Sequence, residues 1–413
     1  MTNAERVRLH RARQKAERER LTYTSDEWRA FVDPASLQRK AGASWSRMAK
    51  MVLRELADNA ADAAGRAGVG IEPVFEDGGL WWCICDHGPG IAPDRVARVF
   101  SVNRPMESTK HVRLPTRGML GNGTRVVAGY CAIEGLPIMV DARGIRTVLR
   151  IDKATGRTLI ERQEPTEPIA GTLVYLPKID DLNENGVADL ARKTLAMANP
   201  APDARVYSGP SSPWWYSAAD LARLLVTAPA GASIGDVVRD MGLRLPRGVP
   251  DGLAAEVTKE RASALLEALR ERYKPIPGDK IGRIGRDAFG DRYPGYAIEH
   301  YKWTPPSSGI HVPVTIEVWA CCDGWKRRDM SVSATVDTYL NRSAVLAGIG
   351  ASGGTEKVYL QGAGISWQSV AAKPGRYQLV ISIITPTLIW YPMARRLISA
   401  TLPASLANLS AEQ

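Results

Sequence analysis

The clearest hydrophobic pattern in the chain lies between Ser44 and Gly68, where apolar residues recur every three or four positions. This spacing places them on one face of an α-helix. Because glycine commonly ends helices, the pattern predicts a helix that starts near Ser46 and stops at Gly65 or Gly68. The expected core-facing stripe consists of Met48, Val52, Leu56, Ala60 and Ala63.

Short apolar runs bounded by glycine follow this helix and are typical of β-strands. They favour an antiparallel or mixed sheet backed by helices, so the chain is expected to be of the α+β class. Helical periodicity then returns in three segments before strand-type runs resume. The expected strands are 79–85, 137–142, 146–152 and 171–177, the later helices are 217–228, 233–243 and 258–273, and the last strands are 312–322, 330–340 and 377–390.

Two stretches rich in proline and small residues, at 199–213 and 274–285, interrupt these patterns and mark candidate boundaries. The first 20 residues carry seven Lys/Arg against three Glu and no apolar stripe. They fit either a solvated basic arm or a frayed terminus. The expected organisation is a basic arm over 1–43, a first domain over 44–198, a helical domain over 199–280 and a last domain over 281–413.

The composition is that of a globular chain, with 45% hydrophobic and 24% charged residues. The 54 Lys and Arg exceed the 44 Asp and Glu by ten, which favours a polyanionic partner such as nucleic acid or nucleotide. The start has no apolar core of a secretory signal, and the most apolar late stretch, 377–394, is too interrupted to cross a membrane. The five cysteines lack zinc spacing, so we expect reduced cysteines in strands and a cytosolic location.

Candidate chemistry begins on the long helix. Glu55, Asn59 and Asp62 lie at offsets of four and seven, on one polar face. By itself such a face is usually only solvated. An apolar run then ends in the turn Asp86-His87-Gly88-Pro89-Gly90, and a second glycine-rich turn, Gly118-Met119-Leu120-Gly121-Asn122-Gly123, precedes Thr124 and a helical pattern. Later, Gly171-Thr172 opens another strand.

In this order the four motifs resemble the Bergerat ATP-binding fold of the GHKL superfamily, an α/β sandwich found in gyrase B, MutL, heat-shock chaperone ATPases and histidine kinases. The resemblance implies that the chain binds ATP and Mg²⁺. It implies that Asp86 accepts the adenine amine with Thr172 supporting it, and that Gly88 and Gly90 let the base approach the backbone. Glu55 would be the general base for an attacking water, and Asn59 the Mg²⁺ ligand.

The phosphates would lie at the glycine-rich turn, where backbone amides and the start of a helix favour anions. The positions that the resemblance places around the nucleotide, besides those already given roles, are Asp62, Lys110, Gly118, Gly121, Asn122, Gly123 and Thr124. Lys110 and Arg125 are expected to be cations near this site, although ordinary surface charges would fit the sequence equally well.

Within the superfamily, the chain resembles the ATP-binding subunit of DNA topoisomerase VI. The helical block that ends in 271–289 is similar to its helix–two-turn–helix segment and the proline-rich loop after it. The segment 312–346 is similar to its transducer domain, including the pair Asn341-Arg342. The residues Ser108-Thr109-Lys110 resemble its lid entrance. The resemblance implies the ATP-hydrolysing subunit of a type IIB topoisomerase-like complex, located in the cytoplasm with the nucleoid, in which ATP closes a homodimer through the ATPase domains onto double-stranded DNA.

DNA cleavage is assigned by the resemblance to a separate chain similar to the DNA-cleaving subunit of topoisomerase VI. The present chain has no Asp-x-Asp pair of the kind that binds metal for strand cleavage in that family. The DNA contacts would involve basic residues of the middle of the chain, unless these only confer solubility: Arg244, Arg247, Lys280, Arg283 and Arg286.

One departure from the family concerns the γ-phosphate. The family's transducer loop presents a lysine there, but the corresponding segment 385–397 contains none. Arg395 or Arg396 would supply the charge with a fork that suits phosphate, or both are surface groups. Two alternatives therefore stay open: a stand-alone ATP-gated DNA clamp in repair, silencing or phage defence, and a nucleotide-binding module with weak hydrolysis.

Overall fold

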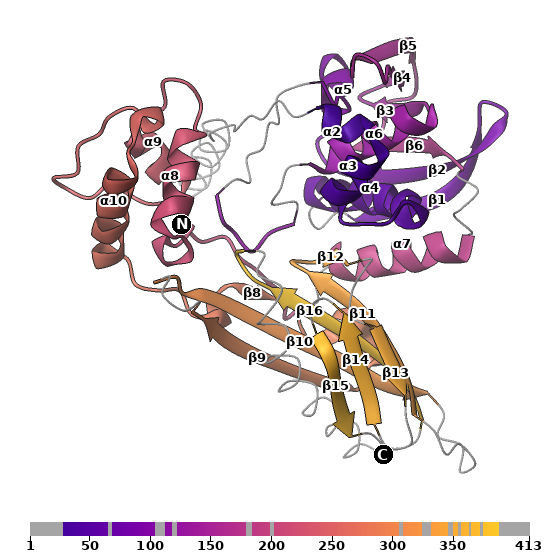
Figure 1. Ribbon diagram of the computed structural model, residues 1–413. Coiled ribbons are helices and arrows are strands. Elements are labelled where there is room, and N and C mark those ends of the chain that lie inside the picture. Colours follow the sequence, from indigo (N-terminus) through magenta and orange to yellow (C-terminus); the bar gives the residue numbers. More distant parts are fainter. Residues whose placement is uncertain are drawn as a thin grey trace, which may run out of the picture.

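The computed structural model describes most of the chain between residues 28 and 387. The described ranges are 28–64, 68–103, 112–117, 122–178, 184–198, 202–304, 309–323, 332–345, 350–353, 357–362, 365–371 and 375–387. Three bodies are visible in Figure 1: an N-terminal α/β unit, a small helical unit beside it, and a group of long strands below both. The chain combines largely antiparallel sheets with helices, and the α+β class is thus confirmed.

The N-terminal unit is built on a six-stranded sheet with the order β1-β2-β6-β3-β4-β5, in which every neighbouring pair is antiparallel. The four strands expected from the sequence are confirmed as β2, β3, β4 and β6, and β1 and β5 form the two edges. The bounds are β1 Val69–Glu76, β2 Gly79–Asp86, β3 Ile138–Ala142, β4 Ile145–Ile151, β5 Thr158–Pro165 and β6 Thr172–Pro177.

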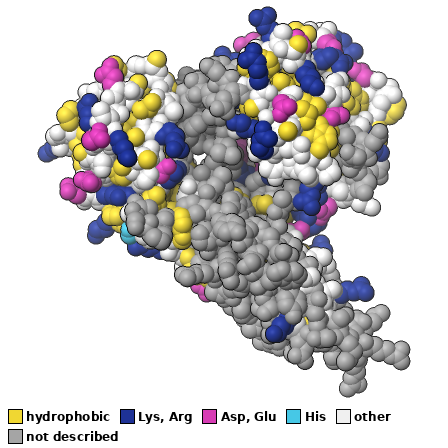
Figure 2. Space-filling model, in the orientation of Figure 1, with side chains coloured by type: hydrophobic (Ala, Val, Ile, Leu, Met, Phe, Trp, Pro, Cys, Tyr) yellow, Lys and Arg dark blue, Asp and Glu magenta, His cyan; other side chains and the backbone are white. Residues whose placement is uncertain are grey.

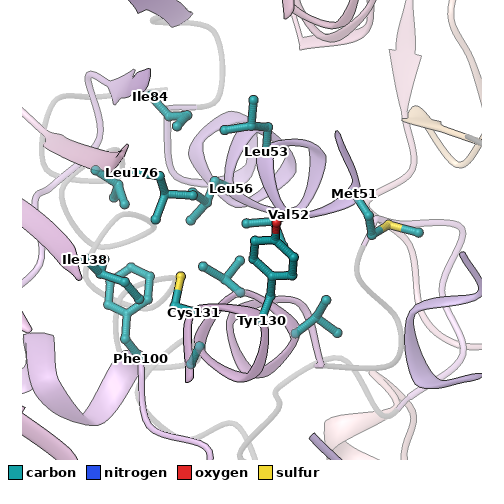
Figure 3. Close-up of a cluster of buried hydrophobic side chains, with 14 of the residues drawn as sticks. Met51, Val52, Leu53, Leu56, Ile84, Phe100, Tyr130, Cys131, Ile138 and Leu176 are labelled. Atoms are coloured by element: carbon teal, nitrogen blue, oxygen red, sulfur yellow. The ribbon is translucent and has the colours of Figure 1, made fainter. Parts of the chain in front are cut away.

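Helices α4 and α6 cover one face of this sheet and enclose its core with it. In Figure 3, Val52 and Leu56 of α4 meet Tyr130 and Cys131 of α6 beside Leu176 of the sheet. Burial of such side chains stabilises each by about 1.5–3 kcal/mol. The helices of this unit are α2 Arg29–Val32, α3 Pro34–Ala41, η1 Trp45–Arg47, α4 Met48–Ala64, α5 Pro93–Val99, α6 Gly123–Glu134 and α7 Glu184–Ala198.

Helix α4 follows the predicted stripe closely. Met48, Val52, Leu56 and Ala60 are buried, as expected. Ala63 is exposed, contrary to the prediction, because the last turn of α4 extends past the core to the turn after β2. The helix starts at Met48 because Trp45–Arg47 form a separate 3₁₀ turn.

The helical unit contains the three helices expected from the sequence. Two of them begin with a capping box, in which a serine and an aspartate three residues later bond each other's backbone amides: Ser217 with Asp220, and Ser233 with Asp236. The bounds are η2 Pro213–Trp215, α8 Ala218–Val226, α9 Ile234–Asp240, η3 Ala254–Glu256, α10 Lys259–Arg272, η4 Gly278–Lys280 and η5 Arg286–Arg292.

The C-terminal strands form a five-stranded sheet with the order β12-β11-β16-β10-β9 and a three-stranded sheet β13-β14-β15. Strand β11 is parallel to β16, and the other pairs are antiparallel. Strands β7 and β8 form a separate two-stranded pair. The bounds are β7 Arg205–Val206, β8 Gly282–Arg283, β9 Gly295–Trp303, β10 Val312–Asp323, β11 Val332–Leu340, β12 Ser343–Ala344, β13 Gly350–Gly353, β14 Lys357–Gly362, β15 Ile365–Ala371 and β16 Gly375–Ile384.

The hydrophobic core of the helical unit continues into the five-stranded sheet. Leu221 and Leu266 of the helices belong to the same buried cluster as Trp319 of β10 and Val380 of β16. That cluster takes residues from both sides of the sequence boundary expected near 280. The opposite face of the five-stranded sheet has its own cluster, centred on residues such as Val314 and Ile381.

The basic arm expected over 1–43 lies outside the described residues up to residue 27, but its remainder is not an arm, because α2 and α3 bury Phe31 and Leu37 in the core of the N-terminal unit. The segment from 388 onward also lies outside the described residues. All five cysteines are free, but Cys131 lies in α6 and not in a strand. Among the described residues, no helix is both long and apolar enough to cross a membrane.

Candidate functional site

The polar face of α4 is confirmed as a single surface. Asn59 and Asp62 are exposed, and Glu55 is half-buried. They project from the side of the helix that does not contact the sheet, since the apolar stripe holds the opposite side in the core. The packing of α4 therefore fixes the direction of all three side chains.

The start of α6 lies directly against this polar face. A Cβ added to Gly123 would stand 2.5 Å from Glu55 Oε2 and 3.4 Å from Asn59 Nδ2. Only glycine permits such an approach without displacement of the carboxylate. The first turn of a helix has amides without intrahelical acceptors and the positive end of the dipole. Glu55, Asn59 and the start of α6 are thus brought together.

A second close approach joins the end of β2 to the end of α4. Asp86 is the last residue of β2, and its Oδ1 accepts a hydrogen bond of 2.7 Å from the Gly88 amide. A Cβ on Gly88 would stand 2.8 Å from the Ala63 carbonyl oxygen. Asp86 is therefore held at the end of the same helix that carries Glu55 and Asn59.

Strand β6, which pairs with β2, provides further contacts to Asp86. Thr172 is the register partner of Asp86 and hydrogen-bonds its carboxylate. Gly171 has φ +94°, and a Cβ there would overlap the carbonyl oxygen of Asp86. Gly90, with φ +73°, approaches Gly171 in turn, since its Cβ would stand 2.8 Å from the Gly171 carbonyl oxygen. Glycine is required at both positions.

Burial raises the pKa of Asp86, and the hydrogen bonds from Gly88 and Thr172 oppose this rise. The side chain is 8% exposed, so it is a nearly desolvated acceptor at the edge of the sheet. A carboxylate in this state binds a donor more strongly than one in water, because the interaction is not screened.

Arg143 was missed by the sequence analysis. It occupies the turn between β3 and β4 with φ +51°, and its Nη2 donates to the Pro89 carbonyl oxygen at 3.3 Å. Its Cγ would lie 3.3 Å from a Cβ on Gly90, so the side chain covers the turn after Asp86. The pair Arg143-Gly144 between two apolar runs was the available sequence signal, typical of a tight hairpin.

A charged cluster on the neighbouring side of α4 was also missed. Arg54 ion-pairs with Glu55, and its Nη1 donates to the Ala344 carbonyl oxygen at 3.1 Å. Asp58 accepts a hydrogen bond from the Ser343 hydroxyl of β12. The helix that presents Glu55 therefore also contacts the C-terminal sheet. Sequence alone gives no signal for a contact between residues 285 positions apart.

Burial raises the pKa of Asp58 to about 6, with Glu55 acting in the same direction and Arg54 against it. Asp62, on the other hand, meets Arg117, whose Nε lies 3.4 Å from Asp62 Oδ1. Arg117 immediately precedes the glycine-rich turn and is 9% exposed.

Arg125 differs from the expectation. It is neither a surface charge nor a member of the site, since it is 1% exposed and its guanidinium lies 4.1 Å above the Phe31 ring. It donates to the Val102 carbonyl oxygen at 3.3 Å. The residue is turned into the core between α6 and α2 because it lies on the inner face of α6.

The other predicted residues divide into two groups. Asn122 and Thr124 flank Gly123 at the start of α6, as expected from the sequence. The remaining ones lie outside the described residues: Lys110, Gly118, Gly121, Arg395 and Arg396.

No family model matches the chain, and a search of curated proteins also gives no match. The interpretation of the site therefore depends on its own geometry.

Proposed function

We propose that this chain is the ATP-binding and ATP-hydrolysing subunit of a type IIB topoisomerase-like complex, with the Bergerat fold of the GHKL superfamily in its N-terminal unit. The observation that carries the proposal is the approach of Gly123 to Glu55 and Asn59, with Asp86 held near the C-terminal end of the same helix. These contacts bring residues of the four sequence motifs together along the C-terminal half of α4.

The arrangement suits a nucleotide bound in one orientation, with its adenine at Asp86 and its phosphates at the start of α6. Asp86 offers a buried acceptor for the exocyclic amine of adenine, which is a hydrogen-bond donor. The start of α6 offers amides and a positive dipole end to the phosphates. Asn59 lies beside it and would hold Mg²⁺, which takes one or two protein oxygens and completes its shell with phosphate and water.

Hydrolysis is assigned to Glu55. Its Oε2 faces the start of α6, where the terminal phosphate would lie, while its Oε1 is paired with Arg54. In phosphoryl transfer a carboxylate orients and deprotonates the attacking water, and positioned bases contribute about 10²–10⁴ in rate. Bound Mg²⁺ would neutralise charge on the phosphates.

The work done with ATP is proposed to be closure of a homodimer around double-stranded DNA. ATP shifts the dimer only by its difference in affinity for the open and closed states. The C-terminal sheet contacts α4 through Ser343 and Ala344, so movement of that sheet and of the nucleotide site are mechanically linked. Cleavage is assigned to a separate chain resembling the DNA-cleaving subunit of topoisomerase VI.

A direct test compares Glu55→Gln with Glu72→Gln, a change of the same kind at an exposed position of β1. We expect magnesium-dependent ATP turnover in the wild type and in Glu72→Gln, and a loss of about 100-fold or more in Glu55→Gln with ATP binding retained. The trapped variant should accumulate as an ATP-dependent dimer. Unchanged turnover in Glu55→Gln would exclude the assigned base.

A second candidate is a stand-alone ATP-gated DNA clamp or a nucleotide-binding module with weak hydrolysis. The absence of lysine from 385–397 favours these alternatives, because no lysine of this segment can then link the γ-phosphate to the transducer. Co-purification from the native source distinguishes the two, since only a topoisomerase-like protein should bring with it a tyrosine- and Asp-x-Asp-bearing chain. ATP binding without turnover in the wild type would favour the module.

A further inference from the structure

The segment Val112–Arg117 connects two separate parts of the molecule. It precedes the glycine-rich turn of the proposed phosphate site, yet Val112 is 1% exposed in the hydrophobic core of the helical unit. Leu114 packs at the edge of the same core. The segment therefore leaves the N-terminal unit and is anchored in its neighbour.

Arg113 is the centre of this anchor, and both its backbone and its side chain take part. Its amide donates to the Tyr216 hydroxyl at 2.6 Å, and its carbonyl oxygen accepts from the Ser211 hydroxyl at 2.8 Å. The guanidinium pairs with Asp220 at 2.9 Å, donates to the Trp215 carbonyl oxygen and lies 4.9 Å from the centre of the Tyr216 ring.

The partners of Arg113 are themselves rigid. Ser211 and Tyr216 are almost fully buried, and their hydroxyl groups hydrogen-bond each other at 2.8 Å. Burial raises the pKa of Tyr216 to about 12, so it stays a neutral acceptor. Asp220 belongs to the capping box of α8, where it accepts from the Ser217 amide at 3.0 Å. The anchor is therefore part of the start of α8.

The other end of the segment is held to the catalytic helix. Arg117 is 9% exposed, and its Nε lies 3.4 Å from Asp62, one turn after Asn59 on α4. Six residues in extended form span at most about 20 Å, so the segment limits how far its two anchored ends can separate. Only five residues of sequence separate Arg117 from Gly123.

We propose that Arg113 and Arg117 are positioning residues that make the phosphate-binding end of the site depend on the helical unit. The inference rests on the proposed nucleotide site and adds a regulatory input to it. A ligand that shifts α8 shifts the segment Val112–Arg117, and by linkage phosphate binding changes the affinity of the helical unit for that ligand by the same factor. Asp86, which is proposed to recognise adenine, is the last residue of β2 and is not part of this segment.

The experiment separates phosphate binding from base binding in the full chain. Arg113→Ala should raise the Kd for a magnesium-bound, non-hydrolysable ATP analogue by about 10-fold or more, within the usual range of coupling between sites. The Kd for adenosine should change less than about twofold, since no phosphate is involved. Arg113→Lys keeps the charge but loses the planar guanidinium with its several donors, so an intermediate rise in the Kd for the ATP analogue is expected.

The control is Arg239→Ala. Arg239 pairs with Asp236 at 2.7 Å, the residue of the α9 capping box that corresponds to Asp220 in α8, so this variant removes an ion pair from a capping box that does not hold the segment Val112–Arg117. Arg239→Ala should leave both affinities unchanged. An equal loss for analogue and adenosine in Arg113→Ala, or no loss for either, would overturn the inference.

Amide hydrogen exchange tests the link without nucleotide. Arg113→Ala should increase exchange at the start of α6, around Thr124 to Val126, and Arg239→Ala should not. Equal exchange in all three proteins contradicts the positional link. Failure of the wild type to bind ATP contradicts instead the proposed function, so the two failures are distinguishable.

Discussion

Asp58 is the residue whose charge is most sensitive to pH in the contact between the N-terminal unit and the C-terminal sheet. Burial raises its pKa from 3.8 to about 6, and its partners there are Arg54, Glu55, Arg117 and Ser343. A raised carboxyl pKa means that the folded chain binds this proton more tightly than the unfolded chain. The stabilisation is therefore complete below pH 3.8 and is lost as the pH rises through 6.

Asp58→Asn, which imitates the protonated form, should remove this dependence. A shift of about two pKa units corresponds to about 3 kcal/mol, so the free energy of unfolding of Asp58→Asn relative to wild type should rise by up to about 3 kcal/mol between about pH 4 and pH 7. Chemical denaturation at several pH values measures the difference, in which other titrating groups cancel. A difference that stays constant over this range would disprove the assignment.

Gly123 tests the geometry of the proposed catalytic carboxylate. A Cβ there must displace Glu55 Oε2, which lies 2.5 Å away, whereas the Cβ of Gly79→Ala would have its nearest neighbour at 3.8 Å. Gly123→Ala should lower kcat by about 10- to 100-fold, because a shift of about 1 Å in a catalytic group is costly. The free energy of unfolding should change by less than about 1 kcal/mol, since alanine suits a helix.

Gly79→Ala is the control for this pair and should keep both turnover and stability. Steady-state turnover and urea denaturation of the wild type, Gly123→Ala and Gly79→Ala measure kcat and the free energy of unfolding. Wild-type kcat in Gly123→Ala would show that the carboxylate and the helix start do not act together.

At the scale of elements, Glu317 joins β10 to the strand β8 and the turn after it. It is fully buried and accepts from the Ile284 amide at 2.6 Å, the Gly285 amide at 2.8 Å and the Tyr296 hydroxyl at 2.8 Å. Burial raises its pKa against the effect of these donors. The three bonds compensate the cost of a carboxyl group inside the sheet.

Glu317→Ala should lower the free energy of unfolding by about 3–5 kcal/mol, because three buried donors lose their acceptor. Exchange of the Ile284 and Gly285 amides should become faster. The matched change Glu299→Ala, at an exposed position of β9, should have little effect. Equal stability of the two variants would refute this role for Glu317.

The helices and strands also show how much of the fold can be predicted from the sequence. Strands β2, β3, β4 and β6 are buried on at least one face, and their apolar runs predicted them. The edge strand β5 is almost entirely exposed, so it has no apolar run and was not predicted. Helix α7 was missed because its amphipathic pattern follows directly on a polar stretch.

The candidate site likewise has one part that the sequence predicted and another part that it did not. The glycine turns and the polar face of α4 were predicted because they are local motifs. The residues that surround them were not: Arg54 bonds to Ala344, and Arg113 bonds to Tyr216. These contacts join residues more than 100 positions apart, which only the tertiary fold brings together.

At the scale of the whole molecule, the N-terminal unit contacts the C-terminal sheet through both α4 and α7. Besides the contact of α4 with β12, Lys193 of α7 pairs with Asp337 of β11 at 2.6 Å. Figure 2 shows basic and acidic side chains interspersed over the helical unit on the face displayed. Charge alone therefore does not mark a DNA surface on that face.

Double-stranded DNA should increase ATP turnover by the wild type, because closure around DNA and ATP binding favour the same state. The effect should fall steeply between about 50 and 200 mM salt, as phosphate contacts are lost. Turnover measured with and without a linear duplex across this salt range tests the expectation. Salt-independent turnover that ignores DNA would favour the nucleotide-binding module.

The central claim is that one pocket, from Asp86 to the start of α6, binds a magnesium adenine nucleotide. Titration calorimetry of the full chain with a non-hydrolysable ATP analogue and Mg²⁺ tests it most directly, with Asp86→Ala as the variant and Asp94→Ala, at an exposed position of α5, as the control. We predict saturable heat in the wild type and in Asp94→Ala, and a loss of about 10-fold or more in affinity in Asp86→Ala, which removes a buried acceptor. No binding heat in the wild type, or equal affinity in Asp86→Ala, would contradict the account.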